Sequence, residues 1–183
     1  MSRFAITKQP DDPELKAMYA EMVECGMQGA EEGIPFNALT AMAGQPEILK
    51  GMWGITKGVL VHGSLPPTVK QMVAMTISMQ NNCRYCSVAH TGALEAMGVP
   101  TEVIKSCAAD PDLAEVPPPQ RAILKFALKI ARDSQSVSDE DFEELKSHGL
   151  SEGEIMEVVM LAAWSNLLNT WTDVSRVPLD GTE

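Results

Sequence analysis

The sequence predicts an all-α fold, a helical domain of roughly seven to nine helices. Three observations predict it. Apolar residues recur at helical spacing, proline and glycine stand where helices begin and end, and no segment alternates apolar and polar residues between hairpin turns. The chain has 183 residues, of which 45% are hydrophobic, so it can bury one core of ordinary size.

Proline marks the beginning of the expected helices in the N-terminal half. A proline in the first turn costs no hydrogen bond, because the first N–H groups of a helix have no intrahelical acceptor. Asn81 and Asn82 then interrupt the pattern, and Asn82 is a favoured type of N-cap for the next helix. The expected helices of this half run from Pro13 towards Cys25, from Pro35 through Met42, from Pro46 to Gly58 and from Pro67 to Gln80.

Glycine and capping patterns mark the helices of the C-terminal half. Gly98 follows the helix that begins at Cys83, and Pro100 stands beyond it. Ser151 and Glu154 have the spacing of a capping box, in which each side chain bonds the backbone N–H of the other residue. The expected helices of this half run from Cys83 to Met97, Thr101 to Ala108, Arg121 to Asp133, Ser138 to His148 and Ser151 to Trp171, and the tail from Val177 is expected to fray.

The charge balance argues against two classes of partner. Twenty-five acidic residues against fourteen basic ones give a net charge of −11. Such a chain repels phosphate backbones and anionic lipids, so neither nucleic acid nor a membrane is an expected partner. The longest apolar run, Val158 to Trp164, is too short to span a bilayer, and residues 1–10 lack the pattern of a secretory signal. The expected location is therefore the cytoplasm, whose reducing conditions make structural disulfides rare.

Cys83, Cys86 and His90 are the most informative residues of the sequence. Residues three and four apart share one face of a helix, so the two thiols and the imidazole stand on one stripe. The positive end of the helix dipole stabilises a thiolate there, and two cysteines at this spacing can close a disulfide. Histidine exchanges protons near neutral pH. These groups suit a redox cycle in which one thiolate attacks a peroxide or disulfide and the second thiol resolves the product into an intramolecular bridge.

Two other interpretations of this stripe remain open, a structural zinc site and a pair of inert, buried cysteines. Zinc takes four ligands, and three ligands crowded on two turns of one helix fit poorly around a tetrahedral ion. Two of the other candidates for a fourth ligand, His62 and His148, each lie near a glycine at a helix end, where capping is expected. The remaining two, Cys25 and Cys107, have no reactive neighbour in the sequence and are expected to be packed.

The pattern around these residues resembles the AhpD-like branch of the carboxymuconolactone decarboxylase family. The motif of that branch is a glutamate followed at a distance by Cys-x-x-Cys-x-x-x-His and a helix that ends in glycine. Cys83, Cys86, His90 and Gly98 fall on this motif. The similarity continues outside the motif and covers the chain from about Ile34 to Asn169, at Gly63 to Val69, Phe126 to Lys129, Gly149 to Val158 and Asn169.

The resemblance implies an oligomer, commonly a trimer or hexamer, with thiol-dependent peroxidase activity on hydroperoxides. By the family's scheme, Cys86 is the peroxidatic cysteine, Cys83 is its resolving partner in a redox-active disulfide, and His90 belongs to a proton relay. Electrons come from a reduced thiol partner such as a lipoylated protein, and no metal, haem or flavin is implied. The family domain is expected over residues 34–176, after a helical extension at 1–33 and before a tail at 177–183.

Gln71 is the position where the sequence departs from the family. The family motif has a glutamate at this proton-relay position, whereas the amide of glutamine can hold a water or the His90 ring but cannot relay a proton. Peroxidase turnover is therefore expected to suffer more than disulfide exchange. Two alternative functions remain: a lyase of the carboxymuconolactone decarboxylase type, which would use acid–base groups without the thiols, and a non-enzymatic helical oligomer.

Overall fold

The computed structural model describes residues 2–182, and over these residues the chain forms nine α-helices and no β-strand. The all-α prediction is therefore confirmed. The α-helices are α1 (Pro13–Glu24), α2 (Asn37–Thr40), α3 (Pro46–Thr56), α4 (Pro67–Gln80), α5 (Arg84–Ala96), α6 (Thr101–Ala109), α7 (Pro118–Arg132), α8 (Asp139–Ser147) and α9 (Glu152–Ser175). Three short elements lie between them: the π-helix η1 (Lys57–Val61), which continues α3, and the 3-10 helices η2 (Pro111–Leu113) and η3 (Ser134–Ser136).

The predicted helix boundaries agree best with the structure where a side chain caps the helix. Asp12 accepts the backbone N–H groups of Glu14 and Leu15 at the start of α1. The predicted capping box forms at the start of α9. By contrast, α7 begins at Pro118, earlier than predicted, because a first-turn proline needs no backbone donor. α9 ends at Ser175, about one turn beyond the predicted end, because its last turn is still packed against the core.

The turn between α4 and α5 corrects one prediction. Asn82 is not the N-cap of α5, because it adopts a left-handed backbone conformation with φ of 57°, which Asn tolerates better than most residues. Cys83 is the N-cap instead, and its backbone N–H donates to the Ser78 carbonyl oxygen at 2.9 Å. The first cysteine of the pair therefore lies at the edge of α5, tied to the last turn of α4.

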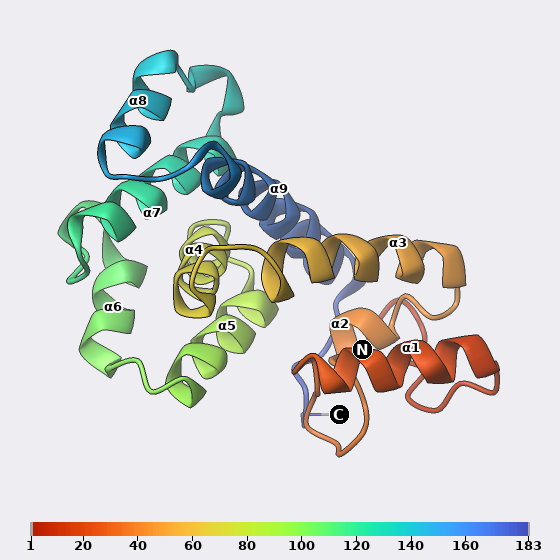
Figure 1. Cartoon of the computed structure of the whole chain (residues 1–183). Helices are drawn as coiled ribbons and strands as arrows, with labels where there is room; N and C mark the ends of the chain where they lie inside the picture. Colours follow the sequence, from red (N-terminus) through yellow and green to blue (C-terminus); the bar gives the residue numbers. More distant parts are fainter. Residues whose placement is uncertain (1, 183) are drawn as a thin grey trace.

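α4 is the central helix of the fold. Every residue from Val69 to Ser78 is buried, and α5, α7 and α9 pack around it (Figure 1). A helix that is buried on all sides belongs to the core rather than to the surface. Gln71 is consequently an interior residue.

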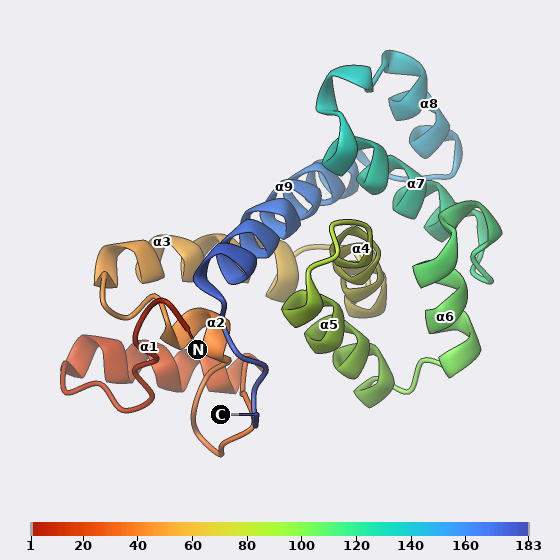
Figure 2. The ribbon, with the colours of Figure 1, turned by 180° about the vertical axis from the view of Figure 1, so that it is seen from behind.

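The other helices lie on two sides of this centre. α1, α2 and α3 form one side, α6, α7 and α8 form the other, and α9 runs diagonally between them, as views from opposite directions agree (Figures 1 and 2). The C-terminal tail returns to α1 and α2, where the Asp180 carboxylate accepts the Asn37 backbone N–H at 2.9 Å. The prediction that the tail frays is therefore wrong for residues 177–182; residue 183 lies outside the described residues.

A buried ion pair fixes the turn that leads into α4. Lys70 is only 2% exposed, and its ammonium group donates to the His62 carbonyl oxygen and lies 3.3 Å from the Glu157 carboxylate. That carboxylate also accepts the backbone N–H groups of Ser64 at 2.6 Å and Leu65 at 3.1 Å. Burying the charge is tolerable because every charged partner is hydrogen-bonded. The contact joins α9 to the start of α4.

Candidate functional site

The two cysteines lie together at the N-terminal end of α5 with both thiols free. The sulfurs of Cys83 and Cys86 lie 3.1 Å and 3.4 Å from the hydroxyl oxygen of Thr172, on α9. A hydroxyl group can accept from a thiol or, after rotation, donate to a thiolate. Because the Thr172 hydroxyl also contacts the Leu168 carbonyl at 2.9 Å, it can exchange one arrangement for the other without leaving a buried polar group unpaired.

The two thiols differ in acidity. The hydrogen bond from the neighbouring Cys86 thiol, helped by Thr172, lowers the pKa of Cys83. The same interaction, together with burial, raises the pKa of Cys86. The two thiols interact directly, so their ionisation belongs to the pair. Of the two thiols, Cys83 is therefore the one that ionises more readily.

Only the second cysteine reaches a cavity. A cavity of about 440 Å³ is lined by Cys86, His90 and Gln71 but not by Cys83. Its other walls are mainly apolar and come from α2, η1, α5 and α9, with Phe36, Leu60, Ala93, Trp164 and Leu168 among them. No Asp, Glu, Lys or Arg side chain lines it. The cavity suits an uncharged molecule with an apolar body, placed next to the Cys86 sulfur.

His90 is neutral and holds a defined tautomer. Burial lowers the pKa of His90 to about 4, so the ring carries no charge at neutral pH. Its Nδ1 lies 2.7 Å from Oε1 of Gln71. An amide oxygen only accepts hydrogen bonds, so Nδ1 carries the hydrogen and Nε2 keeps its lone pair. The edge of the ring packs on Trp164, with 6.1 Å between ring centroids.

The predicted site residues are brought together as the sequence suggests. Cys86, His90 and Gln71 line one cavity, and Cys83 lies directly behind Cys86. Asn169, predicted from the family resemblance, donates to the Ser78 hydroxyl at 2.9 Å and accepts from Asn81 at the same distance. It therefore fixes α9 to the turn that carries the cysteines.

The two remaining cysteines and the two remaining histidines differ in their burial and in their position in the fold. Cys107 is fully buried, as expected. Cys25 is not, because it is half-buried and lines the cavity that holds Cys86, so the expectation that it is packed away from reactive groups is wrong. His62 and His148 each follow the last residue of a helix, as expected. No three His, Cys, Asp or Glu side chains converge as metal ligands within residues 2–182, so the zinc interpretation gains no support.

Sequence reasoning missed a set of contacts that surrounds Tyr85, which stands between the two cysteines. Its hydroxyl group donates to the Asp180 carboxylate at 2.5 Å and accepts the Ala38 backbone N–H at 3.2 Å. Burial, and secondarily the charge of Asp180, raise the pKa of Tyr85, which keeps the hydroxyl protonated. The cysteine turn is thus bonded both to α2 and to the C-terminal tail.

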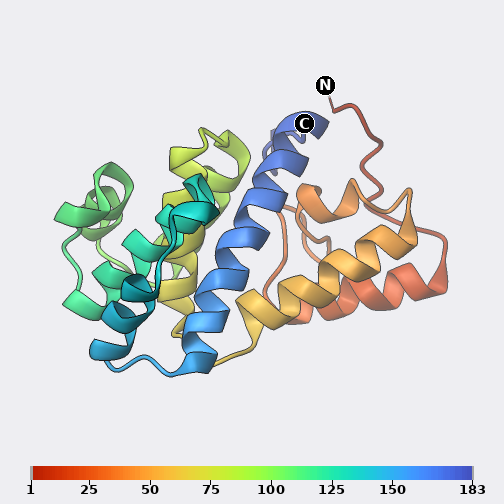
Figure 3. The ribbon, with the colours of Figure 1, turned by 90° about the horizontal axis from the view of Figure 1, so that it is seen from above.

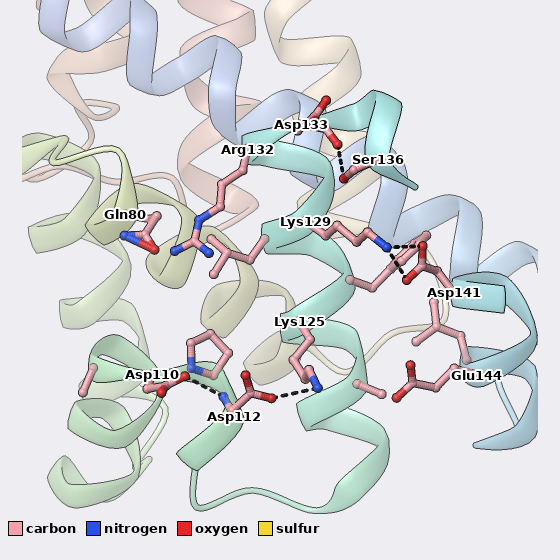
Figure 4. Close-up of a pocket in the computed structure, with 16 residues that line it drawn as sticks. Gln80, Asp110, Asp112, Lys125, Lys129, Arg132, Asp133, Ser136, Asp141 and Glu144 are labelled. Atoms are coloured by element: carbon pink, nitrogen blue, oxygen red, sulfur yellow. Dashed lines mark hydrogen bonds and ion pairs between the residues drawn. The ribbon is translucent and has the colours of Figure 1, made fainter. Parts of the chain in front are cut away.

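A larger cavity lies elsewhere and carries none of this chemistry. It has a volume of about 700 Å³ and lies between η2, α7 and α8 (Figure 4). Lys125 pairs with Asp112 at 2.7 Å, and Lys129 pairs with Asp141 at 2.6 Å. These pairs neutralise two of the basic groups of α7 within the cavity wall. The cavity holds no thiol or imidazole.

The comparisons with known proteins agree with the fold. The model of the carboxymuconolactone decarboxylase family matches residues 46–129. No curated protein matches the sequence. None of the helices traced between residues 2 and 182 combines the length and hydropathy that a membrane-spanning segment requires.

Three solved structures illustrate the likeness in fold. An uncharacterized peroxidase-related protein from Ralstonia eutropha JMP134, described as an alkylhydroperoxidase AhpD core, has a TM-score of 0.85 and 24% identity over 98% of this chain and 93% of that one. An uncharacterized peroxidase-related protein from Silicibacter sp. TM1040 has a TM-score of 0.80 and 23% identity over 99% and 96% of the two chains. The debrominase Bmp8, solved with 2,3,4-tribromopyrrole, has a TM-score of 0.77 and 19% identity over 99% and 95%. The resemblance to the carboxymuconolactone decarboxylase family is therefore confirmed in sequence over residues 46–129, and the likeness to an AhpD-like structure is confirmed in fold over nearly the whole chain.

Proposed function

We propose that the protein is a thiol-dependent oxidoreductase that reduces organic hydroperoxides with Cys86 as the peroxidatic cysteine and Cys83 as the resolving cysteine. One observation carries the proposal: Cys86 opens onto an apolar cavity beside His90, while Cys83 lies behind it with the same Thr172 hydroxyl in contact with both sulfurs. One thiol can therefore meet a substrate and the other can meet only its neighbour.

The reaction begins with proton transfer within the pair. Cys83 as thiolate takes the proton of Cys86, and the Cys86 thiolate attacks the terminal oxygen of the hydroperoxide. The O–O bond breaks and Cys86 becomes a sulfenic acid, whose proton passes to the departing alkoxide to form the alcohol, while the sulfenate oxygen takes the proton of the neighbouring Cys83 thiol. Cys83, again a thiolate, attacks the Cys86 sulfur, so that an S–S bond forms and hydroxide leaves. Two thiols are oxidised and one hydroperoxide is reduced.

His90 and Gln71 position the substrate in this scheme. Neutral His90 presents the lone pair of Nε2, which accepts the O–H of the hydroperoxide and orients its terminal oxygen. Gln71 holds the ring in this tautomer through Nδ1. Neither residue supplies a charge, so proton movement depends on the thiol pair itself.

A second dithiol must return the disulfide to its reduced form. A small thiol or a lipoylated protein attacks one sulfur of the bridge, and the resulting mixed disulfide is resolved by the donor's second thiol. The proposal places this cycle in the reducing cytoplasm and in a homo-oligomer, a trimer or hexamer, as the family resemblance implies.

The lyase alternative is less compatible with the cavity. A decarboxylase acts on a carboxylate, and a buried carboxylate needs a cation or several hydrogen-bond donors. The cavity has no Lys or Arg in its walls, and its histidine is neutral. An uncharged hydroperoxide meets no such penalty.

The experiment is a thiol titration before and after addition of one equivalent of cumene hydroperoxide. The four free thiols should fall to two, and peptide mass spectrometry should find the bridge between Cys83 and Cys86. Cys86→Ser should abolish the loss, whereas Cys107→Ser, the matched control with a buried thiol off the cavity, should still close the bridge. Four thiols remaining in the unaltered protein would exclude the proposal.

A further inference from the structure

A second cavity lies beside the cysteine pair, where α5 begins and α9 ends. It has a volume of about 410 Å³ and is lined by Arg84, Tyr85, Thr172, Asp173, Arg176 and the C-terminal tail from Val177. We call it the tail cavity, because the tail forms one of its walls. Tyr85 also lines the apolar cavity that holds Cys86, so the residue between the two cysteines separates one cavity from the other.

The tail cavity adjoins the buried sulfur of Cys83. Thr172 contacts that sulfur at 3.1 Å, and the carboxylate of Asp173 interacts with the same thiol. Cys83 is 0% exposed, so in the reduced chain these two side chains separate its sulfur from the cavity that they line. Asp173 is itself exposed, and an exposed side chain changes rotamer within nanoseconds. Its rotation opens an approach to Cys83 without any unfolding of the chain.

Two arginines give the tail cavity a positive charge that the protein does not neutralise. Every lysine other than Lys16 has an acidic partner. Arg84 and Arg176 have none within residues 2–182, although acidic residues outnumber basic ones by twenty-five to fourteen. Asp173 supplies the one carboxylate among the described residues of the wall, so two guanidinium groups leave the tail cavity with a net positive charge.

A third arginine lies at the same end of α9 and has a different role. The backbone N–H of Arg3 donates to the Ser175 carbonyl oxygen at 2.8 Å, so the start of the chain lies beside the last turn of α9 (Figure 3). The Arg3 guanidinium group donates to the Val174 carbonyl oxygen, also at 2.8 Å. A cation suits these carbonyl groups because the C-terminal end of a helix is partially negative. Arg3 fills that role, which leaves Arg84 and Arg176 available to a ligand.

The chemistry of the tail cavity suits a small molecule with a carboxylate. A guanidinium group donates two parallel hydrogen bonds to the two oxygens of a carboxylate, a match that few other anions fit as well. A volume of about 410 Å³ lies within the range of small-molecule sites, roughly 300–1,000 Å³. The tail cavity thus combines an anion-binding wall with an approach to the sulfur that the apolar cavity does not reach.

We propose that the tail cavity admits the electron donor, and that this donor is a small dithiol with a free carboxylate, which Arg84 and Arg176 bind. The inference rests on the proposed function, which requires a dithiol to reduce the Cys83–Cys86 bridge. An uncharged hydroperoxide then reaches Cys86 from one side, and an anionic donor reaches Cys83 from the other. A lipoyl group attached to a protein has an amide in place of the carboxylate and lacks the group that the arginines recognise.

Reduction of the bridge consists of two thiol–disulfide exchanges. The first donor thiol loses its proton and attacks the Cys83 sulfur, so that a donor–Cys83 bond forms, the Cys83–Cys86 bond breaks and Cys86 takes up the proton. The second donor thiol then attacks the donor sulfur bound to Cys83. The donor closes its own disulfide, and Cys83 leaves with the second proton. Two donor thiols are oxidised and one protein disulfide is reduced.

The first test compares two donors that differ only at the carboxyl end. Dihydrolipoate carries a carboxylate there, whereas dihydrolipoamide carries a neutral amide on the same dithiol. The bridge is formed beforehand with diamide, so the test needs no peroxidase turnover. Protein thiols are counted by alkylation and mass spectrometry at intervals after the donor is added. In low salt, dihydrolipoate should reduce the bridge at least tenfold faster than dihydrolipoamide at the same concentration.

Arginine variants connect that difference to the tail cavity. Arg84→Gln and Arg176→Gln should each bring the dihydrolipoate rate towards the dihydrolipoamide rate, which should itself stay unchanged. Arg132→Gln is the matched control, because Arg132 is also an exposed arginine without a partner among the described residues but lies on α7, in the wall of the 700 Å³ cavity. Equal rates for the two donors in the unaltered protein, or a ratio that survives both variants, would overturn the donor site alone. A chain in which diamide forms no Cys83–Cys86 bridge would overturn the proposed function as well.

The second test identifies the sulfur that the donor attacks. Mercaptoacetate has a carboxylate but only one thiol, so its mixed disulfide with the protein persists until acid quenching and alkylation. Trypsin cleaves after Arg84 and places the two cysteines on separate peptides. Mass spectrometry should find the adduct on Cys83. An adduct found mainly on Cys86 would mean that the donor enters through the apolar cavity, and it would contradict the proposal.

Discussion

Gln71 accepts a hydrogen bond from His90, with 2.7 Å between Oε1 of the amide and Nδ1 of the ring. The glutamine belongs to the buried central helix α4, and the histidine belongs to the cysteine helix α5. A neutral amide at this position leaves the ring uncharged, whereas a carboxylate would pair with an imidazolium. The relationship therefore decides whether the site has a proton donor in addition to its thiols.

We expect Gln71→Glu to increase peroxide turnover. The new carboxylate would raise the pKa of His90 and allow the ring to deliver a proton to the departing alkoxide, an effect worth about tenfold or more. The measurement is the rate of cumene hydroperoxide turnover as a function of pH. The maximum rate should rise, and the pH at which it occurs should shift. Gln71→Leu, which removes the hydrogen bond without adding a charge, should lower turnover. Equal rates in all three proteins would show that proton movement bypasses His90.

His90 should make the fold sensitive to acid. Its pKa is lowered to about 4 in the folded chain, against about 6.5 in an unfolded one. Between these values the unfolded state binds more protons, so stability falls as the pH falls through this window. From pH 7 to pH 5 the loss attributable to this group is about 2 kcal/mol. Urea unfolding at the two pH values should show it, and His90→Gln should lack that part of the loss. An equal loss in the variant would place the sensitivity on other groups.

Removal of the Thr172 hydroxyl should make the thiol pair less acidic. Thr172→Val keeps the shape of the side chain but removes the group that contacts both sulfurs, so the pKa of Cys83 should rise towards the ordinary thiol value. Thiolate absorbance followed against pH measures the change. Thr170→Val makes the same substitution two residues earlier on the exposed face of α9 and should leave the titration unchanged. Identical titrations in both variants would remove Thr172 from the site.

Tyr85→Phe should release the C-terminal tail. The substitution removes the hydroxyl group that donates to Asp180 at 2.5 Å and accepts from the Ala38 N–H at 3.2 Å. Loss of these bonds should cost about 1–3 kcal/mol and speed amide exchange at Ala38 and in residues 177–182. Hydrogen exchange with mass spectrometry gives the readout, with α7 peptides as the internal reference. Unchanged exchange in the tail would mean that its other contacts hold it.

Local patterns in the sequence were enough to predict most of the helices and the central part of the site. Proline and capping residues act within one turn of where they stand, so Pro13, Pro46 and Ser151 mark helix starts correctly. The spacing of Cys86 and His90 likewise predicts a shared face, because four residues complete about one turn. Gln71 was identified through the family motif rather than through any local rule.

The contacts that sequence reasoning missed join residues far apart in the chain. Thr172 lies 86 and 89 positions from the two cysteines, and Asp180 lies 95 positions from Tyr85. Nothing in the neighbourhood of these residues distinguishes them from ordinary helix or tail residues. Cys25 reaches the cavity for the same reason, because tertiary packing places the loop after α1 in the wall of the cavity that α5 also lines. Such placements follow from how the helices assemble, which short-range periodicity does not encode.

The burial of Cys83 behind Cys86 affects how well the protein would tolerate excess oxidant. Inactivation of a peroxidatic thiol usually requires a second oxidant molecule to reach the sulfenic acid before the resolving thiol does. Here the sulfur of the resolving Cys83 contacts the same Thr172 hydroxyl as the Cys86 sulfur, so it is already close to Cys86. Cys83 does not line the cavity, so an oxidant in the cavity does not reach it. With the proposed chemistry, overoxidation to sulfinic acid should therefore be slow and confined to the Cys86 sulfur. Activity should decline little over many turnovers.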